Sequence, residues 1–89
     1  MEISERIKMF RRDYGESFLY QLLNRMQSDC EYFLGFGNRL EKYLWAGNVS
    51  GQIAYMKALW ESFDENAKPE WLSWQQILKY ETAMVEQYC

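Results

Sequence analysis

The sequence predicts an all-α fold, a compact bundle of three or four main helices with a short helical turn between the second and the third. Apolar residues recur every three to four positions through most of the 89 residues, which is the spacing of one helix face. No stretch alternates between apolar and polar residues as a half-buried strand does. A chain of this length has room for one core, so we expect a single helical domain over residues 1–89.

The first helix is expected to end near Gly15, because glycine is unfavourable inside a helix. Its apolar positions are Ile3, Ile7, Phe10 and Tyr14. The second helix starts at Glu16 and carries the strongest periodic pattern. That stripe consists of Phe18, Leu19, Leu22, Leu23, Met26, Cys30, Phe33 and Leu34.

The sequence Gly-Phe-Gly-Asn follows the second helix and predicts a sharp turn. We expect Gly35 to end the helix in the left-handed conformation, with Phe36 folding back towards Cys30. Gly37 is expected to supply a second position with positive φ, and Asn38 to cap a short helical piece.

A phosphate-binding loop is the alternative interpretation of these glycines. That loop follows a strand and carries Lys-Ser or Lys-Thr after its second glycine, whereas Asn38 and Arg39 stand here, after a helix. We therefore prefer a structural turn, in which Arg39 forms an ion pair with Asp29. The residues assigned to this structural turn are Asp29, Gly35, Gly37 and Asn38.

Two further helices are expected in the second half of the chain. Asn48 or Ser50 caps the third, and Pro69 stops it from continuing, so a loop or single turn follows. Its apolar positions are Ile53, Met56, Leu59, Trp60 and Phe63. Ser73 and Gln76 form a capping box for the fourth helix. The apolar positions of that helix are Trp74, Ile77, Leu78, Met84, Val85 and Tyr88.

The composition argues against catalysis. The absence of histidine removes the commonest general base and most zinc sites. Cys30 lies on the apolar stripe and is expected to be a buried hydrophobic residue. An enzyme using Asp29, Arg39 and Tyr43 would lack a base tuned near neutral pH. We therefore expect no enzymatic activity, cofactor or metal.

Charge and cysteine content favour a cytoplasmic protein that binds neither membrane nor nucleic acid. The net charge is −3, and the two cysteines do not form the framework of a secreted domain. No apolar run approaches the roughly 18 residues of a membrane span. A basic cluster on the first helix leaves nucleic-acid binding as the alternative function. Its residues are Arg6, Lys8, Arg11 and Arg12.

Sixteen aromatic residues exceed what so small an interior should hold, so some are expected at the surface. Trp60 and Trp74 match helix stripes and are expected in the core, whereas Trp71 lies off any stripe. Exposed Trp, Tyr and Arg dominate binding energy in protein interfaces. The candidate partner-binding residues are Arg39, Tyr43, Trp45 and Trp71.

The stretches RMQSDCEYFLGFGNR, LWAG, QIAYMKALWESF and KPEWLSWQQI resemble the large polyvalent protein-associated domain type 11, a family of Firmicutes phages, plasmids and conjugative elements. The resemblance covers roughly residues 17–88. Its most specific parts are residues 29–32, 37–39 and 44–47. Many members carry a histidine where this chain has Tyr43, so no role of that imidazole applies here.

This resemblance implies an accessory factor that helps a mobile element establish itself in a host. It implies no enzymatic activity. For a small acidic member it implies a counter-defence inhibitor of anti-CRISPR or antirestriction type. Such an inhibitor would act in the cytoplasm of the bacterial host cell. It would occlude the surface of a host or element protein, for example a defence enzyme that processes nucleic acid.

Overall fold

The computed structural model describes residues 2–85, so Tyr88 and Cys89 lie outside the described residues. These residues form four α-helices and two short 3₁₀ turns, without a strand, which confirms the all-α prediction. The elements in chain order are α1 (Ile3–Tyr14), α2 (Glu16–Leu34), η1 (Glu41–Tyr43), α3 (Val49–Ser62), η2 (Glu65–Ala67) and α4 (Trp74–Val85).

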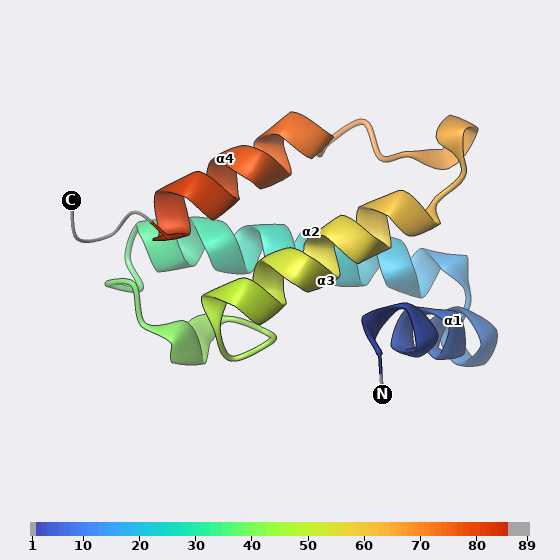
Figure 1. The fold of residues 1–89 in the computed structure, drawn as a ribbon, viewed down its shortest axis with the longest axis horizontal. Coiled ribbons are helices and arrows are strands. Elements are labelled where there is room, and N and C mark those ends of the chain that lie inside the picture. Colours follow the sequence, from blue (N-terminus) through green and yellow to red (C-terminus); the bar gives the residue numbers. More distant parts are fainter. Residues whose placement is uncertain (1, 86–89) are drawn as a thin grey trace.

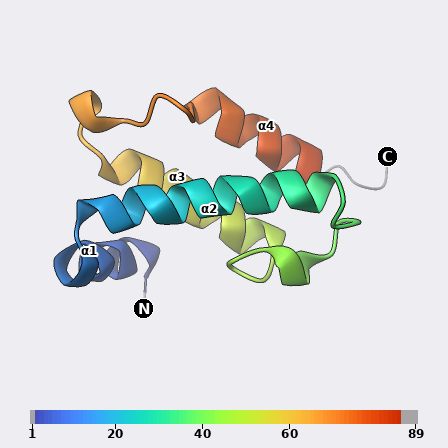
Figure 2. The ribbon, with the colours of Figure 1, turned by 180° about the vertical axis from the view of Figure 1, so that it is seen from behind.

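The long helix α2 runs through the middle of the molecule (Figure 1). Helix α3 contacts the other three helices, and α1 and α4 each pack against both α2 and α3. Seen from both sides, α1 lies near the start of α2, while the end of α4 lies near the end of α2 (Figures 1 and 2). The molecule therefore has two distinct ends, one at the α1–α2 junction and one at the turn that follows α2.

One hydrophobic core joins all four helices, and the stripe of α2 supplies much of it. Its buried members are Leu19, Leu22, Leu23, Met26, Cys30 and Phe33. Trp60 and Trp74 pack against this core with ring centroids 5.5 Å apart, although both are only partly buried. Tyr14, Leu78 and Val85 match the helical period but are exposed.

The predicted helix starts are confirmed. Asn48 caps α3, because its side chain accepts a hydrogen bond of 2.6 Å from the Gly51 N–H. The Ser73 N–H donates to Gln76 Oε1 at 2.8 Å, and the Gln76 N–H donates to Ser73 Oγ at 3.1 Å. These reciprocal bonds form the expected capping box ahead of α4.

The conformations predicted for the turn after α2 were wrong. Neither Gly35 nor Gly37 has a positive φ, which Asn38 (53°) and Arg39 (59°) take instead. Gly37 is required for space, since an added Cβ would lie 2.9 Å from the carbonyl oxygen of Tyr32. The end of α2 is closed by backbone bonds from Gly35, Gly37 and Arg39 to carbonyls of its last turn.

Two further expectations for this turn were also wrong. Asn38 does not cap a helical piece, because η1 begins only at Glu41 and Leu40 occupies the cap position. Phe36 does not fold back towards Cys30, since 90% of its surface is exposed. The backbone bonds that close α2 direct this residue outward, so the core is completed without its ring.

Candidate functional site

Large apolar side chains are exposed mainly at the end of the molecule where α2 and α4 both finish. Among the described residues eight such side chains are exposed, and five of them belong to this end. We call these five the turn-end cluster: Tyr32, Phe36, Leu40, Tyr43 and Val85. Exposed apolar patches of this kind mark interaction sites on soluble proteins.

Contacts and hydrogen bonds connect three members of the turn-end cluster, and Phe36 is their neighbour along the chain. The rings of Tyr32 and Tyr43 meet edge to face, with centroids 5.0 Å apart. The Leu40 N–H donates to the carbonyl oxygen of Gly37 at 3.1 Å, and the Tyr43 N–H donates to that of Leu40 at 3.1 Å. Phe36 adjoins Gly37, whose Cα faces the Tyr32 ring. These residues therefore form one surface segment.

Arg39 ties this segment to the end of α4. Its Nη1 donates to the carbonyl oxygen of Ala83 at 3.0 Å and to that of Met84 at 3.5 Å. A cation at the last carbonyls of a helix is favourable, because those groups carry the negative end of the helix dipole. The same contact brings Val85 next to the turn.

The predicted ion pair between Asp29 and Arg39 does not form. Asp29 Oδ1 lies 3.3 Å from Arg25 Nε, and Asp29 Oδ2 accepts the Trp45 N–H at 3.0 Å. Arg39 is already bound to the carbonyls of α4, so the turn is closed by two separate anchors. Asp29, Arg39 and Tyr43 were considered as catalytic residues. Asp29 and Arg39 bind different partners, so the two charged residues of this set are not paired with each other.

Three side chains fix the loop between Leu40 and Val49. Besides Asp29, the fully buried Gln52 accepts the Ala46 N–H at 3.0 Å and donates to the carbonyl oxygen of Met26 at 3.1 Å. Glu41 accepts the Val49 N–H at 2.8 Å. The polar groups behind the turn-end cluster thus hold its backbone in place.

The four predicted partner-binding residues do not form one surface. Tyr43 belongs to the turn-end cluster, and Arg39 lies beside it. Trp45 is half-buried, with its ring 5.1 Å from that of Tyr55. Trp71 is 40% exposed and lies before the start of α4, whereas Arg39 contacts the other end of that helix. Since a helix of 12 residues is about 18 Å long, Trp71 is well separated from Arg39.

The opposite end of the molecule, which we call the corner end, carries a smaller aromatic cluster. The ring centroid of Tyr14 lies 4.8 Å from that of Phe18 and 6.4 Å from that of Phe10. Tyr14 is 63% exposed, and the other two rings pack against the core. A cavity of about 370 Å³ opens between α1 and α3, and Arg11 and Ser62 are among the residues that line it.

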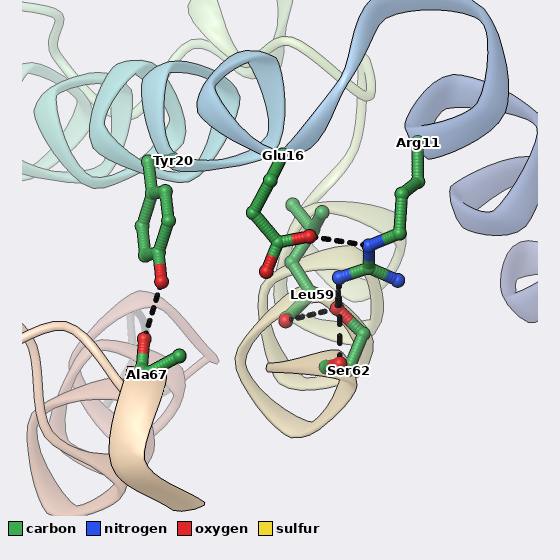
Figure 3. Close-up of polar contacts among 6 residues, drawn as sticks. All are labelled: Arg11, Glu16, Tyr20, Leu59, Ser62 and Ala67. Carbon is green, nitrogen blue, oxygen red and sulfur yellow. Dashed lines mark hydrogen bonds and ion pairs between the residues drawn. The ribbon is translucent and has the colours of Figure 1, made fainter. Parts of the chain in front are cut away.

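Arg11 joins three helices at the corner end (Figure 3). Its Nε lies 2.5 Å from Glu16 Oε1, and its Nη2 donates to Ser62 Oγ at 3.2 Å. Glu16 is the first residue of α2, and Ser62 is the last residue of α3. The Glu16 carboxylate therefore lies at a helix N-terminus and the Arg11 guanidinium at a helix C-terminus, and each of these helix ends favours a charge of that sign. Nearby, Tyr20 OH donates to the carbonyl oxygen of Ala67 at 2.5 Å and holds η2 against α2.

The other arginines of α1 also have intramolecular partners. Arg6 donates to Tyr55 OH at 3.0 Å, and Arg12 Nε lies 3.0 Å from Asp13 Oδ1. A nucleic-acid site needs several cations aligned towards phosphates. The contacts of Arg6, Arg11 and Arg12 do not favour that use of the basic helix.

The buried Cys30 has a packing role in the core and not a chemical one. Burial raises the pKa of the Cys30 thiol to about 12, and its Sγ lies 3.5 Å from Met56 Sδ. A thiol with so high a pKa is a poor nucleophile. Within residues 2–85 no three Cys, Asp or Glu side chains form a group suited to a metal ion.

The comparison with protein families identifies the domain. A model of the large polyvalent protein-associated domain 11 family matches residues 16–84. The chain belongs to this family. It is thus an accessory domain of the kind associated with large polyvalent proteins. The match includes the 32–43 segment of the turn-end cluster, whereas α1 precedes it.

Comparisons with curated proteins and with solved structures find no match. Within residues 2–85, every helix is too short or too polar to cross a bilayer.

The turn-end cluster includes exposed residues that sequence analysis did not select: Tyr32, Phe36, Leu40 and Val85. Phe36 could have been found by the criterion that selected Trp71, since it also lies off every helical stripe. Val85 matches the apolar period of α4, so the local pattern carries no signal for its exposure.

Proposed function

We propose that this domain is a non-enzymatic accessory factor of a phage or mobile element that binds another protein through the turn-end cluster. The observation that carries this proposal is the concentration of exposed apolar side chains there, with Phe36 90% exposed. A hydrophobic centre rich in aromatic residues is typical of the surfaces that dominate protein binding. The fixed backbone behind it reduces the entropy lost on binding.

We further propose that the partner is a host defence enzyme that processes nucleic acid, and that the domain inhibits it by covering part of its surface. Membership of a family associated with large polyvalent proteins supports an accessory role beside a mobile element. The net charge of −3 suits approach to an enzyme with a basic groove, because complementary charge speeds association.

A transformation assay tests the counter-defence role. Bacteria with an active restriction or CRISPR system would express the domain and receive a plasmid that this system targets. We expect the wild-type domain to raise transformation efficiency at least tenfold, and the double variant Phe36→Ser/Tyr43→Ser to remain near the empty-vector level. Trp71→Ser is the matched control, an exposed aromatic residue away from the cluster, and should behave as wild type.

Binding and inhibition can fail separately. If the wild-type domain leaves transformation unchanged against restriction and CRISPR systems alike, the counter-defence role is wrong. If Trp71→Ser loses activity and the double variant keeps it, the binding surface is misplaced.

A further inference from the structure

We infer that helix α1 is an exchangeable arm that joins two copies of this chain in a domain-swapped dimer. In this dimer the hinge at Gly15 opens, α1 and α2 form one continuous helix, and α1 packs against α2 and α3 of the second copy. The second copy donates its own α1 in return. The inference is independent of the proposed function, because it concerns the corner end and not the turn-end cluster.

The hinge between α1 and α2 is a single residue, Gly15. Its φ of 90° and ψ of 172° lie in a region of backbone conformation that is essentially restricted to glycine. The Gly15 N–H donates to the carbonyl oxygen of Arg11 at 3.0 Å, which is the bond of a continuing helix. A change in the backbone angles of this one residue would therefore join the 12 residues of α1 and the 19 residues of α2 into one helix.

The aromatic rings beside the hinge suit both conformations. The ring centroids of Tyr14 and Phe18 lie 4.8 Å apart across the bend. Because these residues are four positions apart, their side chains would also be neighbours on successive turns of a continuous helix. Opening the hinge therefore keeps this contact. What opening removes is the packing of α1 on α2 and α3, and α1 of a second copy restores that packing.

The interface that holds α1 is small. Ile7 is the one buried residue of α1, whereas α2 buries six, and a cavity of about 370 Å³ lies between α1 and α3. Two arginines of α1 also bind α3, where Arg6 donates to Tyr55 OH at 3.0 Å and Arg11 to Ser62 Oγ at 3.2 Å. The match to the family begins directly after the hinge, at residue 16. Helix α1 is thus an addition to the family domain that can leave it at a low cost.

A second copy is the occupant that fits the vacated surface. It brings the same helix to the same surface, so the contacts of Ile7, Arg6 and Arg11 form again between chains and no new interface is needed. Since both copies exchange the same element, the dimer closes with two-fold symmetry and does not extend into a polymer. The exchange takes place at the corner end, opposite the turn that follows α2 (Figures 1 and 2). The dimer therefore leaves two turn-end clusters accessible.

Sedimentation velocity after refolding from urea at increasing chain concentration tests this inference. We expect a dimer fraction in the wild type that increases with the concentration during refolding. Gly15→Ala strains the bent hinge and favours the continuous helix, so the dissociation constant of the dimer should fall roughly tenfold for each hinge and roughly a hundredfold for the pair.

The chain offers a matched control for this substitution. Gly47, in the loop before α3, also has a positive φ (82°) and open space around its Cβ position. Gly47→Ala introduces similar strain without a pair of helices to join, and its dimer fraction should equal that of the wild type. Insertion of two glycines after Gly15 relaxes the bend and weakens a continuous helix, so it should lower the dimer fraction.

Crosslinking distinguishes a swapped dimer from any other dimer. Lys8 of α1 and Glu61 of α3 line the same cavity. The variant Lys8→Cys/Glu61→Cys, with Cys89→Ser to remove the terminal thiol, would be treated with a short bismaleimide, to which the buried Cys30 is not accessible. On a denaturing gel, the crosslinked monomer fraction should keep the mass of one chain, and the crosslinked dimer fraction should have the mass of two.

Four outcomes would overturn the inference. They are a wild type that stays monomeric at every refolding concentration, a dimer fraction in Gly47→Ala as large as that in Gly15→Ala, a dimer fraction unchanged by the glycine insertion, and a dimer whose crosslinks lie within single chains. If Gly15→Ala does not fold, as judged by circular dichroism, the wild type, the insertion and the crosslinks still decide.

Discussion

The two ends of the molecule are built in different ways. At the corner end, Arg11, Glu16 and Ser62 tie three helices together with charged and polar groups. At the turn end, backbone bonds, the buried Gln52 and charged side chains bound to backbone groups hold the chain, and apolar rings remain outside. Charged groups that bind one another, as at the corner end, are less available to a partner. At the turn end the polar groups that fix the backbone are bound to it and do not cover the apolar rings, which remain free to bind.

Both ends nevertheless use an arginine to bind the last carbonyls of a helix in another part of the fold. Arg11 of α1 donates to the carbonyl oxygen of Ser62 at 3.4 Å, and Arg39 donates to that of Ala83 at 3.0 Å. Arg11 also pairs with Glu16, whereas the hydrogen-bond partners of Arg39 among the described residues are carbonyls. Screening by salt should therefore affect the two ends differently.

The largest effect is expected from alanine at the two glycines that shape these ends. Gly37→Ala places a methyl group 2.9 Å from the Tyr32 carbonyl oxygen and should reduce the free energy of unfolding by about 2 to 3 kcal/mol. Gly15→Ala meets no atom within 4 Å but is strained by φ of 90°, at a cost of about 2 kcal/mol. Urea unfolding measures both, and only Gly37→Ala should also lose partner binding.

A loss of binding in Gly15→Ala equal to that in Gly37→Ala would mean that binding reports overall stability. The turn end would then have no special role.

The second prediction concerns the buried amide behind the turn end. Gln52→Leu leaves the Ala46 N–H without its side-chain acceptor and should reduce the free energy of unfolding by roughly 2 kcal/mol. Hydrogen exchange of the Ala46 and Trp45 amides should accelerate. The exposed Gln21 is the control, and Gln21→Leu should change stability by less than about 0.5 kcal/mol. Equal effects of the two substitutions would contradict the role of Gln52.

The sequence predicted the helices well because each one carries its own apolar stripe and its own end signals. The pattern on α2 and the capping box at Ser73 and Gln76 are local, and both were confirmed. Gln52 shows the opposite case. Its amide bonds Met26, 26 positions earlier, and a lone glutamine in a helical pattern gives no indication of such a contact.

The turn was predicted less well because its conformation depends on contacts across the fold. Gly35 and Gly37 were expected to supply positive φ, but the need for space beside Tyr32 explains Gly37. The partner of Arg39 lies 44 positions away, at Ala83. From sequence spacing, we expected the nearby carboxylate of Asp29 to be the partner of Arg39. In the folded chain, Arg39 instead binds carbonyl oxygens of α4.

The third prediction tests whether the Cys30 thiol, in the core near the turn end, is shielded from water. Burial raises the pKa of Cys30 from 9.0 to about 12, so the folded state keeps a proton that the unfolded chain loses above pH 9. This stabilisation is fully present below pH 9 and is lost as the pH rises towards 12. The free energy of unfolding should fall by about 1 kcal/mol between pH 9 and pH 10. Cys30→Ala should be flatter over this interval, and identical slopes would show that Cys30 contacts water.

The smallest effect is expected from the ion pair at the corner end. Arg11→Met keeps most of the aliphatic stem but loses the bonds to Glu16 and Ser62, and should lower the free energy of unfolding by about 1 kcal/mol. Because both charged groups are partly exposed, 1 M NaCl should reduce this difference. Arg12→Met is the matched control and should have no measurable effect, since the one ion pair of Arg12 within residues 2–85 is with its neighbour Asp13 at the surface.

Guanidinium chloride would screen the charges itself, so urea is the appropriate denaturant for this comparison. A salt-independent loss in Arg11→Met would show that the corner end is held by packing, as the turn end is. A salt-dependent loss there, together with salt-independent losses in Gly37→Ala and Gln52→Leu, would establish the difference between the ends. It would also explain why the end held mainly by bonds to backbone groups is the better surface for an apolar partner.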